Sequence, residues 1–460
     1  MIKELSISGF RGFGELQTVC FSLPDGKTFG SGLSIITGAN NSGKTTIIES
    51  IKAFNGKDAP AFSEGKRNNF TDGMVSLKLL DENDSLYSVN SILGGGSSSK
   101  RNGLPHFRSY IVQSRRAVPF EFNRSYADKN WFLNNSMKLE SQRSSSLNNF
   151  DVRLFQIEEE KELFDKVLCS VLGDDFSWAI EQRDSGQYYI KYMQNGISHS
   201  SEGIGDGIWS VFTICAALYD SSSDRIIVID EPELSLHPSL QKKLLNLLLE
   251  FSKDIQIILC THSPYFISWE AIMNGGSLIR VVKEGKNSKC YCLNDNCKSV
   301  IRGLISDQNN PHVLGIEASE VFFLDDSIIL VEGQEDVVIY RKIIGDLEIS
   351  LGGEFFGWGV GGAAKMNSFL SMFESLGYKR IVVIFDGDKE PEFNNLKDTY
   401  PQYKFFILPE DDIRNKKEYT NKAKSGIVDD KRVVKKEYVS YIRQLFNEIN
   451  MYFDIHKETK

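Results

Sequence analysis

The chain has 460 residues, a net charge of −9 and seven cysteines, with 41% hydrophobic and 25% charged residues. This length exceeds one ordinary hydrophobic core and predicts two or three domains. The composition is typical of a soluble globular protein, and no apolar run approaches the roughly 20 residues that cross a bilayer. The charged N-terminus and the odd, scattered cysteines predict a cytoplasmic protein without a membrane anchor. The acidic balance does not exclude nucleic-acid binding, because local basic patches and acidic metal sites coexist in one chain.

Residues 2–23 are expected to form a strand, a turn and a second strand, with Arg11 in the turn. Arg11 has two interpretations, a nucleotide contact or a surface arginine. The apolar run 33–37 then predicts a strand, and an apolar helix is expected after residue 46.

A glycine-rich turn, GANNSGKTT, joins this strand to the helix and fits the P-loop pattern G-x-x-x-x-G-K-[ST]. Its glycines let backbone N–H groups approach phosphates, its lysine adds positive charge, and its threonine hydroxyl is a ligand for Mg²⁺. The sequence therefore predicts ATP binding. The expected contacts are Gly38, Asn40, Asn41, Ser42, Gly43, Lys44, Thr45 and Thr46.

A strand at 110–112 ends at Gln113, a candidate sensor of Mg²⁺ and of the attacking water. Residues 124–172 are polar and then helical, with apolar spacing near 3.6 over 155–172. Because no heptad run of coiled-coil length is present, this segment is expected to be a compact helical insertion.

A second glycine-rich stretch, 197–208, runs into an apolar helix at 209–219, which is again a phosphate-binding geometry. The run 225–230 is a β-branched strand of the kind buried in parallel sheets, and it ends in Asp230 and Glu231. Asp230 is expected to hold the Mg²⁺ of the nucleotide and Glu231 to polarise the attacking water. The next strand, 255–260, is followed by His262, a candidate for contact with the γ-phosphate.

These motifs and their spacing resemble an ABC-type ATPase head over about residues 1–300. The resemblance implies that a signature loop of one subunit closes on the nucleotide of another, and so implies a homodimer. Here the loop reads SSEGIGDG, which departs from the usual LSGGQ and puts its individual residues in doubt. The matching positions are Ser201, Gly203 and Gly205.

The C-terminal third contains two further buried strands that end in carboxylates. The first precedes Glu332 and Gly333, and the second precedes Asp386 and Asp388. Between them lie a strand-like glycine-rich segment at 357–365 and a helix at 366–376, so the order predicts a small parallel α/β sheet. Carboxylates at neighbouring strand ends converge at one sheet edge, and an oxygen-only cluster favours Mg²⁺ or Mn²⁺. A metal held there activates water for phosphoryl displacement.

The E-G turn followed by D-x-D resembles the Toprim signature. A Toprim domain behind an ABC head resembles the OLD (overcoming lysogenization defect) family of ATP-dependent nucleases, which includes bacterial antiphage proteins. This resemblance implies a metal role for Asp336 and a transition-state role for a C-terminal lysine, for which Lys431 is the candidate in a lysine-rich stretch. After the strand 404–408, Glu410 and Asp412 are the candidates for a second metal.

We therefore predict an α/β protein with an ABC-type P-loop ATPase domain at 1–310 and a Toprim nuclease domain at 311–460. The expected function is ATP-gated DNA cleavage, with the subunits paired through their heads and with a defence-system partner protein or RNA as a further expectation. The catalytic candidates are Glu231, His262, Glu332, Asp386, Asp388 and Lys431. The alternative is a regulatory ATPase or clamp whose Toprim domain binds without cutting.

Overall fold

A computed structural model describes residues 1–71, 73–114, 124, 127–135, 138, 150–194, 196–200, 205–221, 226–294, 296–299, 319, 327–416 and 424–455. The chain divides into two compact units, Met1–Cys292 and Leu293–Lys460, called here the head unit and the Toprim unit. The domain boundary expected at 310/311 lies outside the described residues. Within the described residues, no helix has the length and apolar character needed to cross a bilayer.

The head unit is built on a six-stranded sheet in the order β14-β13-β3-β12-β11-β7. All neighbours are parallel except β14, which pairs antiparallel with β13. The three strands β3, β12 and β11 are buried along their whole length, as parallel strands covered on both faces must be. The strands are β3 (Leu33–Thr37), β7 (Ser109–Val112), β11 (Ile226–Asp230), β12 (Gln256–Cys260), β13 (Ser277–Glu284) and β14 (Asn287–Cys292).

A five-stranded antiparallel sheet forms a second layer of the head unit, in the order β2-β1-β4-β5-β6. Buried Gln256 ties this sheet to the parallel one, because its amide accepts from the backbone N–H of Ile2 and donates to the carbonyls of Ile2 and Ser22. The strands are β1 (Ile2–Ser8), β2 (Gln17–Cys20), β4 (Ser76–Asp81), β5 (Leu86–Ser91) and β6 (Ser99–Asn102).

The helices of the head unit include α1 (Lys44–Lys52), α6 (Pro238–Phe251) and α7 (Trp269–Met273). The expected insertion contains α2 (Lys129–Asn135), α3 (Asp151–Glu159) and α4 (Lys161–Leu172), followed by the hairpin sheet of β8 (Ser177–Gln182), β9 (Tyr188–Gln194) and β10 (Ile197–Ser200). One helix was expected over 155–172. The structure has two, because the backbone leaves the helical region at Glu160 (φ −117°).

Helix α5 (Asp206–Asp220) is buried on nearly every turn and packs against α4. Its last residue forms a buried ion pair with α3. Arg153 donates from Nε to Asp220 Oδ2 at 2.9 Å and from Nη2 to Oδ1 at 2.5 Å. At its other end, a Cβ added to Gly207 would lie 2.4 Å from the carbonyl oxygen of Ser235. Helix α5 therefore touches the insertion at one end and the turn after β11 at the other.

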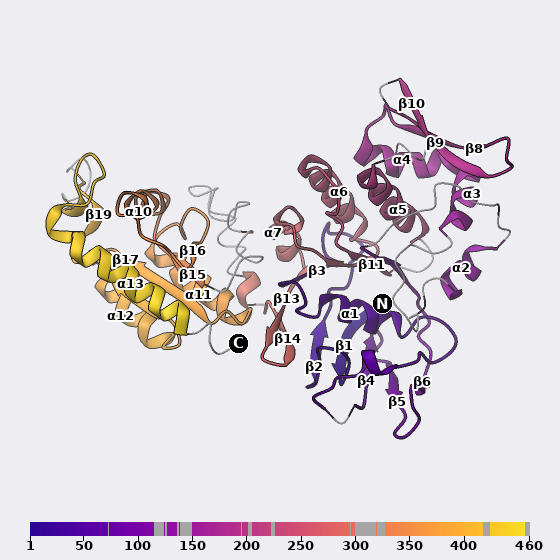
Figure 1. Cartoon of the computed structure of the whole chain (residues 1–460), viewed down its shortest axis with the longest axis horizontal. Coiled ribbons are helices and arrows are strands. Elements are labelled where there is room, and N and C mark those ends of the chain that lie inside the picture. The colour runs from indigo at the N-terminus through magenta and orange to yellow at the C-terminus, as the bar shows by residue number, and fades with distance from the viewer. Residues whose placement is uncertain are drawn as a thin grey trace. The chain divides into compact units, whose positions relative to one another are not determined.

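The Toprim unit contains a four-stranded, wholly parallel sheet in the order β16-β15-β17-β18 (Figure 1). Its strands are β15 (Ser327–Leu330), β16 (Glu354–Phe355), β17 (Arg380–Phe385) and β18 (Lys404–Ile407). Along the chain, the strand that falls between β15 and β17 is β16, although in the sheet β15 and β17 are direct neighbours. Strand β16 precedes the glycine-rich segment, which was itself expected to be strand-like. Gly357, Gly359, Gly361 and Gly362 all have positive φ, which a strand does not permit.

Helices α10 (Gln334–Asp346), α11 (Met366–Ser375), α12 (Glu390–Thr399) and α13 (Val439–Ile455) complete this unit. Apolar side chains of β15, β17, α10 and α13 form one core, which includes Ile329, Val382, Tyr340 and Phe446. A short parallel pair, β19 (Asp412–Arg414) and β20 (Gly426–Val428), lies beyond β18. The sheet thus places the ends of β15 and β17 next to each other, with β19 and β20 following along the chain.

Candidate functional site

The first candidate site is the P-loop between β3 and α1. Gly38 and Gly43 have φ of 144° and 121°, values that favour glycine, and Asn41 has φ 61°. Lys44 folds back over the loop and donates from Nζ to the carbonyl oxygens of Gly38 and Ala39, at 2.8 and 3.0 Å. Burial lowers the pKa of Lys44, while the neighbouring acids, led among the carboxylates by Asp230, oppose that effect. The loop thus has the backbone form of a phosphate cradle, with its cation held in it.

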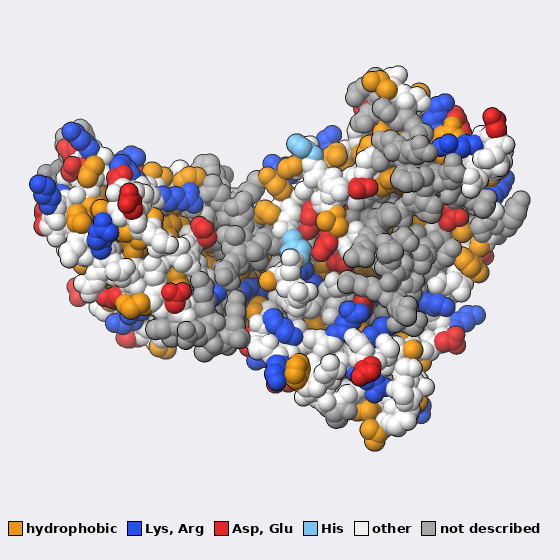
Figure 2. Space-filling view, in the orientation of Figure 1, with side chains coloured by type: hydrophobic (Ala, Val, Ile, Leu, Met, Phe, Trp, Pro, Cys, Tyr) orange, Lys and Arg blue, Asp and Glu red, His pale blue; other side chains and the backbone are white. Residues whose placement is uncertain are grey.

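The acidic end of β11 lies at the same edge of the sheet as this loop. Only one strand, β12, lies between β11 and β3 in the sheet, and all three are parallel. Asp230 is the last residue of β11 and lies opposite Cys260. Glu231 follows with φ 50°, and its Oε1 lies 3.9 Å from His262 Nε2. Figure 2 shows histidine and carboxylate side chains close together on this face of the head unit. The candidate water-polarising and γ-phosphate residues are therefore brought together.

Histidine 262 is half-buried, and burial followed by the charge of Lys44 lowers its pKa, while Glu231 acts in the opposite direction. A neutral imidazole is both a donor and an acceptor, so its Nε2 can serve either role toward phosphate or water. A third carboxylate, Glu233, accepts hydrogen bonds from Thr261 and His262. Glu233 is not among the residues predicted from the sequence, although it stands two residues after Glu231.

Some of the other residues predicted to contact the nucleotide lie close to this site, and others lie outside the described residues. Gln113 is half-buried directly after β7, the strand beside β11. Gly205 precedes the first turn of α5, whereas Ser201 and Gly203 lie outside the described residues. Residues 197–200, expected to be loop, form strand β10. Arg11 forms an ion pair with Glu49 of α1, Nε to Oε2 at 2.8 Å, so it contacts the helix that follows the P-loop.

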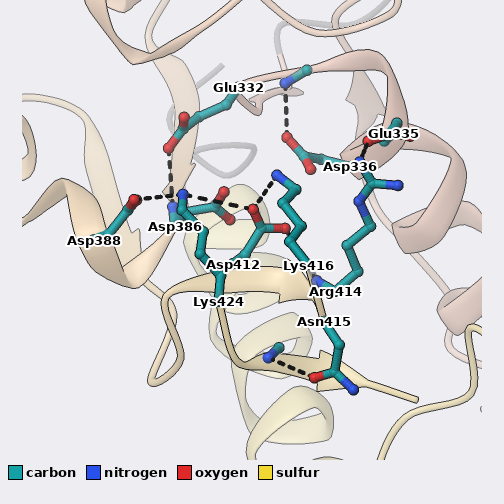
Figure 3. Close-up of polar contacts among 12 residues, drawn as sticks. Glu332, Glu335, Asp336, Asp386, Asp388, Asp412, Arg414, Asn415, Lys416 and Lys424 are labelled. Carbon is teal, nitrogen blue, oxygen red and sulfur yellow. Dashed lines mark hydrogen bonds and ion pairs between the residues drawn. The ribbon is translucent and has the colours of Figure 1, made fainter. Parts of the chain in front are cut away.

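The second candidate site is the acidic cluster of the Toprim unit, defined here as Glu332, Asp336, Asp386, Asp388 and Asp412 (Figure 3). Glu332 follows β15, and its Oε1 accepts from the backbone N–H of Asp386 at 3.2 Å. Asp336 lies in the first turn of α10 and accepts from the N–H of Gly333 at 2.7 Å. The parallel pairing of β15 and β17 brings these groups to one sheet edge, as the sequence predicted.

Burial dominates the electrostatics of this cluster. It raises the pKa of Asp386 to about 8, and the charges of Asp336, Glu332 and Asp412 add to the rise. Burial likewise raises the pKa of Asp336 to about 6 and raises that of Glu332. With a pKa of about 8, the Asp386 carboxyl holds its proton at neutral pH unless a cation replaces that proton.

Lysines of the segment around β19 and β20 supply part of that positive charge. Lys424 Nζ lies 2.5 Å from Asp388 Oδ2 and 3.8 Å from Asp412 Oδ2, and Lys416 forms an ion pair with Asp412. Burial alone would raise the pKa of Asp388, but Lys424 and Lys389 outweigh it and lower that pKa. Asp412 itself is completely buried.

Two predicted site residues, Glu410 and Lys431, make contacts outside the acidic cluster. Glu410 forms a hydrogen bond with the hydroxyl of Tyr438, and hydrogen bonds from Ser425 and Tyr438 lower its pKa. Lys431 lies exposed in a turn, where its backbone N–H donates to Asp429 at 2.9 Å, and its catalytic role stays a prediction. In the part of the chain that the structure describes, no three His, Cys, Asp or Glu residues form a ready-made metal-binding group. The lysines that form ion pairs with the acidic cluster are Lys389, Lys416 and Lys424.

Comparisons with known proteins give two family matches, one within the head unit and one within the Toprim unit. Residues 82–268 match the AAA domain family AAA_21, whose description names the AbiEii toxin of a Type IV TA system. Residues 323–388 match the family described as overcoming lysogenization defect protein-like, TOPRIM domain. Together with the P-loop, these matches define the chain as an enzyme of the ATPase–Toprim class.

Two curated relatives point the same way. Septu protein PtuA of Bacillus thuringiensis is 24% identical over 314 residues, which cover 59% of this chain and 74% of PtuA. OLD nuclease of Thermus scotoductus is 25% identical over 244 residues, which cover 49% of this chain and 45% of that nuclease. The chain thus combines an AAA-type ATPase domain with an OLD-like Toprim domain, and this confirms the pair of domains that the sequence resemblance predicted.

Solved structures of SMC head domains also align with the chain. An SMC head bound to the C-winged helix domain of ScpA is 16% identical, with a TM-score of 0.42, and the alignment covers 64% of this chain and 98% of that one. The SMC head domain from Thermotoga maritima is 17% identical, with a TM-score of 0.38, and the alignment covers 64% of this chain and 99% of that one.

Proposed function

We propose that the chain is an ATP-hydrolysing, divalent-metal-dependent DNA endonuclease of antiphage defence, in which the nucleotide state of the head unit gates cleavage by the Toprim unit. The observation that carries the proposal is the acidic cluster. Carboxylates from two adjacent parallel strands are buried together, and the pKa of Asp386 is raised to about 8. Buried like charges at a strand edge are costly unless they serve a cation. A P-loop in the preceding unit adds the nucleotide dependence.

In the head unit, Lys44 and the loop N–H groups bind the phosphates of ATP, and Thr45 and Asp230 hold its Mg²⁺. Glu231 orients and deprotonates the attacking water, while His262 contacts the γ-phosphate. Gln113 lies beside the same strand ends. The signature positions Ser201, Gly203 and Gly205 act on the nucleotide of a second copy, which makes the working form a homodimer.

In the Toprim unit, Glu332, Asp386 and Asp388 would hold Mg²⁺ or Mn²⁺. The donor set fits such an ion, because it contains only carboxylate oxygens, and burial raises the pKa of Asp386 and Glu332 despite the neighbouring lysines, which leaves room for a cation to stabilise their ionised forms. A bound ion supplies an activated water and stabilises the charge of the phosphoryl transition state. Asp336, Glu410 and Asp412 are the remaining acidic ligands of the proposal, and Lys431 is its candidate for transition-state charge.

The direct test is cleavage of plasmid DNA by the purified protein with Mg²⁺ or Mn²⁺, with and without ATP. Asp386→Ala is expected to abolish cutting, and Lys44→Ala to abolish the effect of ATP while the Toprim chemistry remains. Cutting that persists in Asp386→Ala would refute the assignment of the Toprim site. Cutting that does not respond to ATP or to Lys44→Ala would refute gating.

A regulatory ATPase that binds nucleic acid or a partner without cutting is the second candidate. The contacts of Lys424 with Asp388 and of Lys416 with Asp412 favour it, because these lysines already neutralise part of the cluster. The same plasmid assay separates the two. DNA retention without nicking under every metal and nucleotide condition would support the clamp. A defence-system partner protein or RNA remains part of both proposals.

A further inference from the structure

Glu233 joins the two strand ends that carry the ATPase candidates. It belongs to the turn after β11, two residues beyond Glu231, and its carboxylate points to the segment after β12. Oε2 accepts a hydrogen bond from Thr261 Oγ1 at 2.8 Å, and Oε1 accepts one from the backbone N–H of His262 at 2.5 Å. The side chain of one strand end therefore fixes the backbone of the other at the residue that bears the imidazole.

A second bridge ties the same two segments a few residues further on. Ser263 donates from its backbone N–H to Thr261 Oγ1 at 3.0 Å and from Oγ to Gln241 Oε1 at 2.6 Å. Gln241, on α6, donates from Nε2 to the carbonyl oxygen of Leu236 at 2.9 Å. Because Thr261 Oγ1 accepts from Ser263 and donates to Glu233, the two bridges form one continuous network.

The register of the sheet explains why this network matters for catalysis. β11 and β12 are neighbours, and the N–H of Glu231 donates to the carbonyl of Cys260 at 2.8 Å. Beyond this bond β11 ends and Glu231 adopts φ 50°, while the β12 side keeps one more sheet bond, from the N–H of Thr261 to the carbonyl of Ile36 at 3.1 Å. The imidazole of His262 then depends on contacts outside the sheet to stay 3.9 Å from Glu231 Oε1. The Glu233 carboxylate provides two of these contacts.

Burial raises the pKa of Glu233, against the hydrogen bonds from His262 and Thr261 that favour its ionised form. A half-buried carboxylate is a costly choice for a turn residue, since most turn geometries need no side-chain charge. An acceptor with two oxygens is, however, what two converging donors require. The residue type therefore matches the contacts seen.

We propose that Glu233 is a positioning residue of the ATPase, which holds the His262 segment so that the imidazole faces Glu231 and the γ-phosphate. This inference rests on the proposed ATPase function. It separates Glu233 from the carboxylates expected to act on metal or water, because its oxygens are directed at protein donors.

The test compares Glu233→Ala with Glu233→Gln, and uses Glu250→Ala, an exposed glutamate at the end of α6, as the matched control. Steady-state ATP hydrolysis gives kcat and KM, and a fluorescent ATP analogue gives Kd. Glu233→Ala is expected to lower kcat about 10- to 100-fold, the scale of a misplaced catalytic group, with Kd changed less than about 3-fold. Glu233→Gln should recover most of kcat, because its carbonyl accepts from His262 and its amide donates to Thr261.

Hydrogen–deuterium exchange in the nucleotide-free protein supplies a readout that does not need activity. Amides of residues 261–263 should exchange faster in Glu233→Ala than in the wild type, and the Glu250→Ala control should not differ. Unchanged exchange and unchanged kcat in Glu233→Ala would overturn the proposal, as would a Glu233→Gln variant as slow as Glu233→Ala. A wild type that hydrolyses no ATP would instead refute the proposed function, while the exchange comparison would still decide whether Glu233 holds His262.

Discussion

Loss of the ion pair between Arg153 and Asp220 should destabilise the head unit more than loss of an exposed pair. The two side chains are only 6% and 4% exposed, and the guanidinium makes two hydrogen bonds to the carboxylate. Asp220→Ala leaves a buried guanidinium without its carboxylate, and breaking such a pair costs about 3–5 kcal/mol. Since domains are stable by roughly 5–15 kcal/mol, the loss should be a large part of the free energy of unfolding.

Replacing both members, as in Arg153→Met with Asp220→Leu, should cost far less, because no uncompensated charge remains. Urea unfolding followed by tryptophan fluorescence suits the measurement, since Trp131, Trp178, Trp209 and Trp269 all lie in the head unit. Unfolding of Asp220→Ala at the wild-type urea midpoint would contradict a stabilising role for the pair. A double variant as unstable as the sum of the two single variants would contradict it equally, since the pair would then carry no coupling.

Three further predictions concern the Toprim cluster and the end of α1. Because Asp386 has a folded pKa of about 8 against 3.8 unfolded, the metal-free protein should lose stability as pH rises between these values, and Asp386→Asn should flatten that dependence, measured as Tm in EDTA. Gly359→Ala places a Cβ 2.7 Å from the backbone of Gly333 at a φ of +85°, so a cost of about 1–3 kcal/mol and slower cleavage are expected; an unchanged Tm would contradict this. Asn55→Ala removes both side-chain hydrogen bonds to the backbone of Ser109 and should lower stability by about 1–3 kcal/mol in urea unfolding.

The strand ends that bear the candidate carboxylates could be predicted from the sequence, because they depend on local patterns. The run before Asp230 is continuous and β-branched, and such a run specifies a buried parallel strand whatever its neighbours are. The same holds for the run before Asp386. Parallel pairing then places Glu332 beside Asp386 without further information, as the structure has it.

Contacts between distant segments could not be predicted in the same way. Nothing in the spacing of Glu233 says that its partners are Thr261 and His262, since Glu231 follows the same strand and is an equal candidate by sequence. Lys424 lies in a stretch rich in lysines, and only the backbone pairing of residues 416 and 424 selects it for Asp388. The break at Glu160 was missed because apolar spacing continues through it, although the backbone does not.

The close approach of Gly207 to Ser235 places the start of helix α5 directly against the turn after β11. There is no room for a side chain between the start of this helix and the turn that holds Glu233, so a displacement of either one moves the other. Fifteen residues of helix span about 22 Å, and the far end is fixed to α3 by the buried Asp220–Arg153 pair. A packed helix does not compress along its axis. We therefore expect helix α5 to move as one rigid element, so that a displacement of the turn after β11 would reach the insertion.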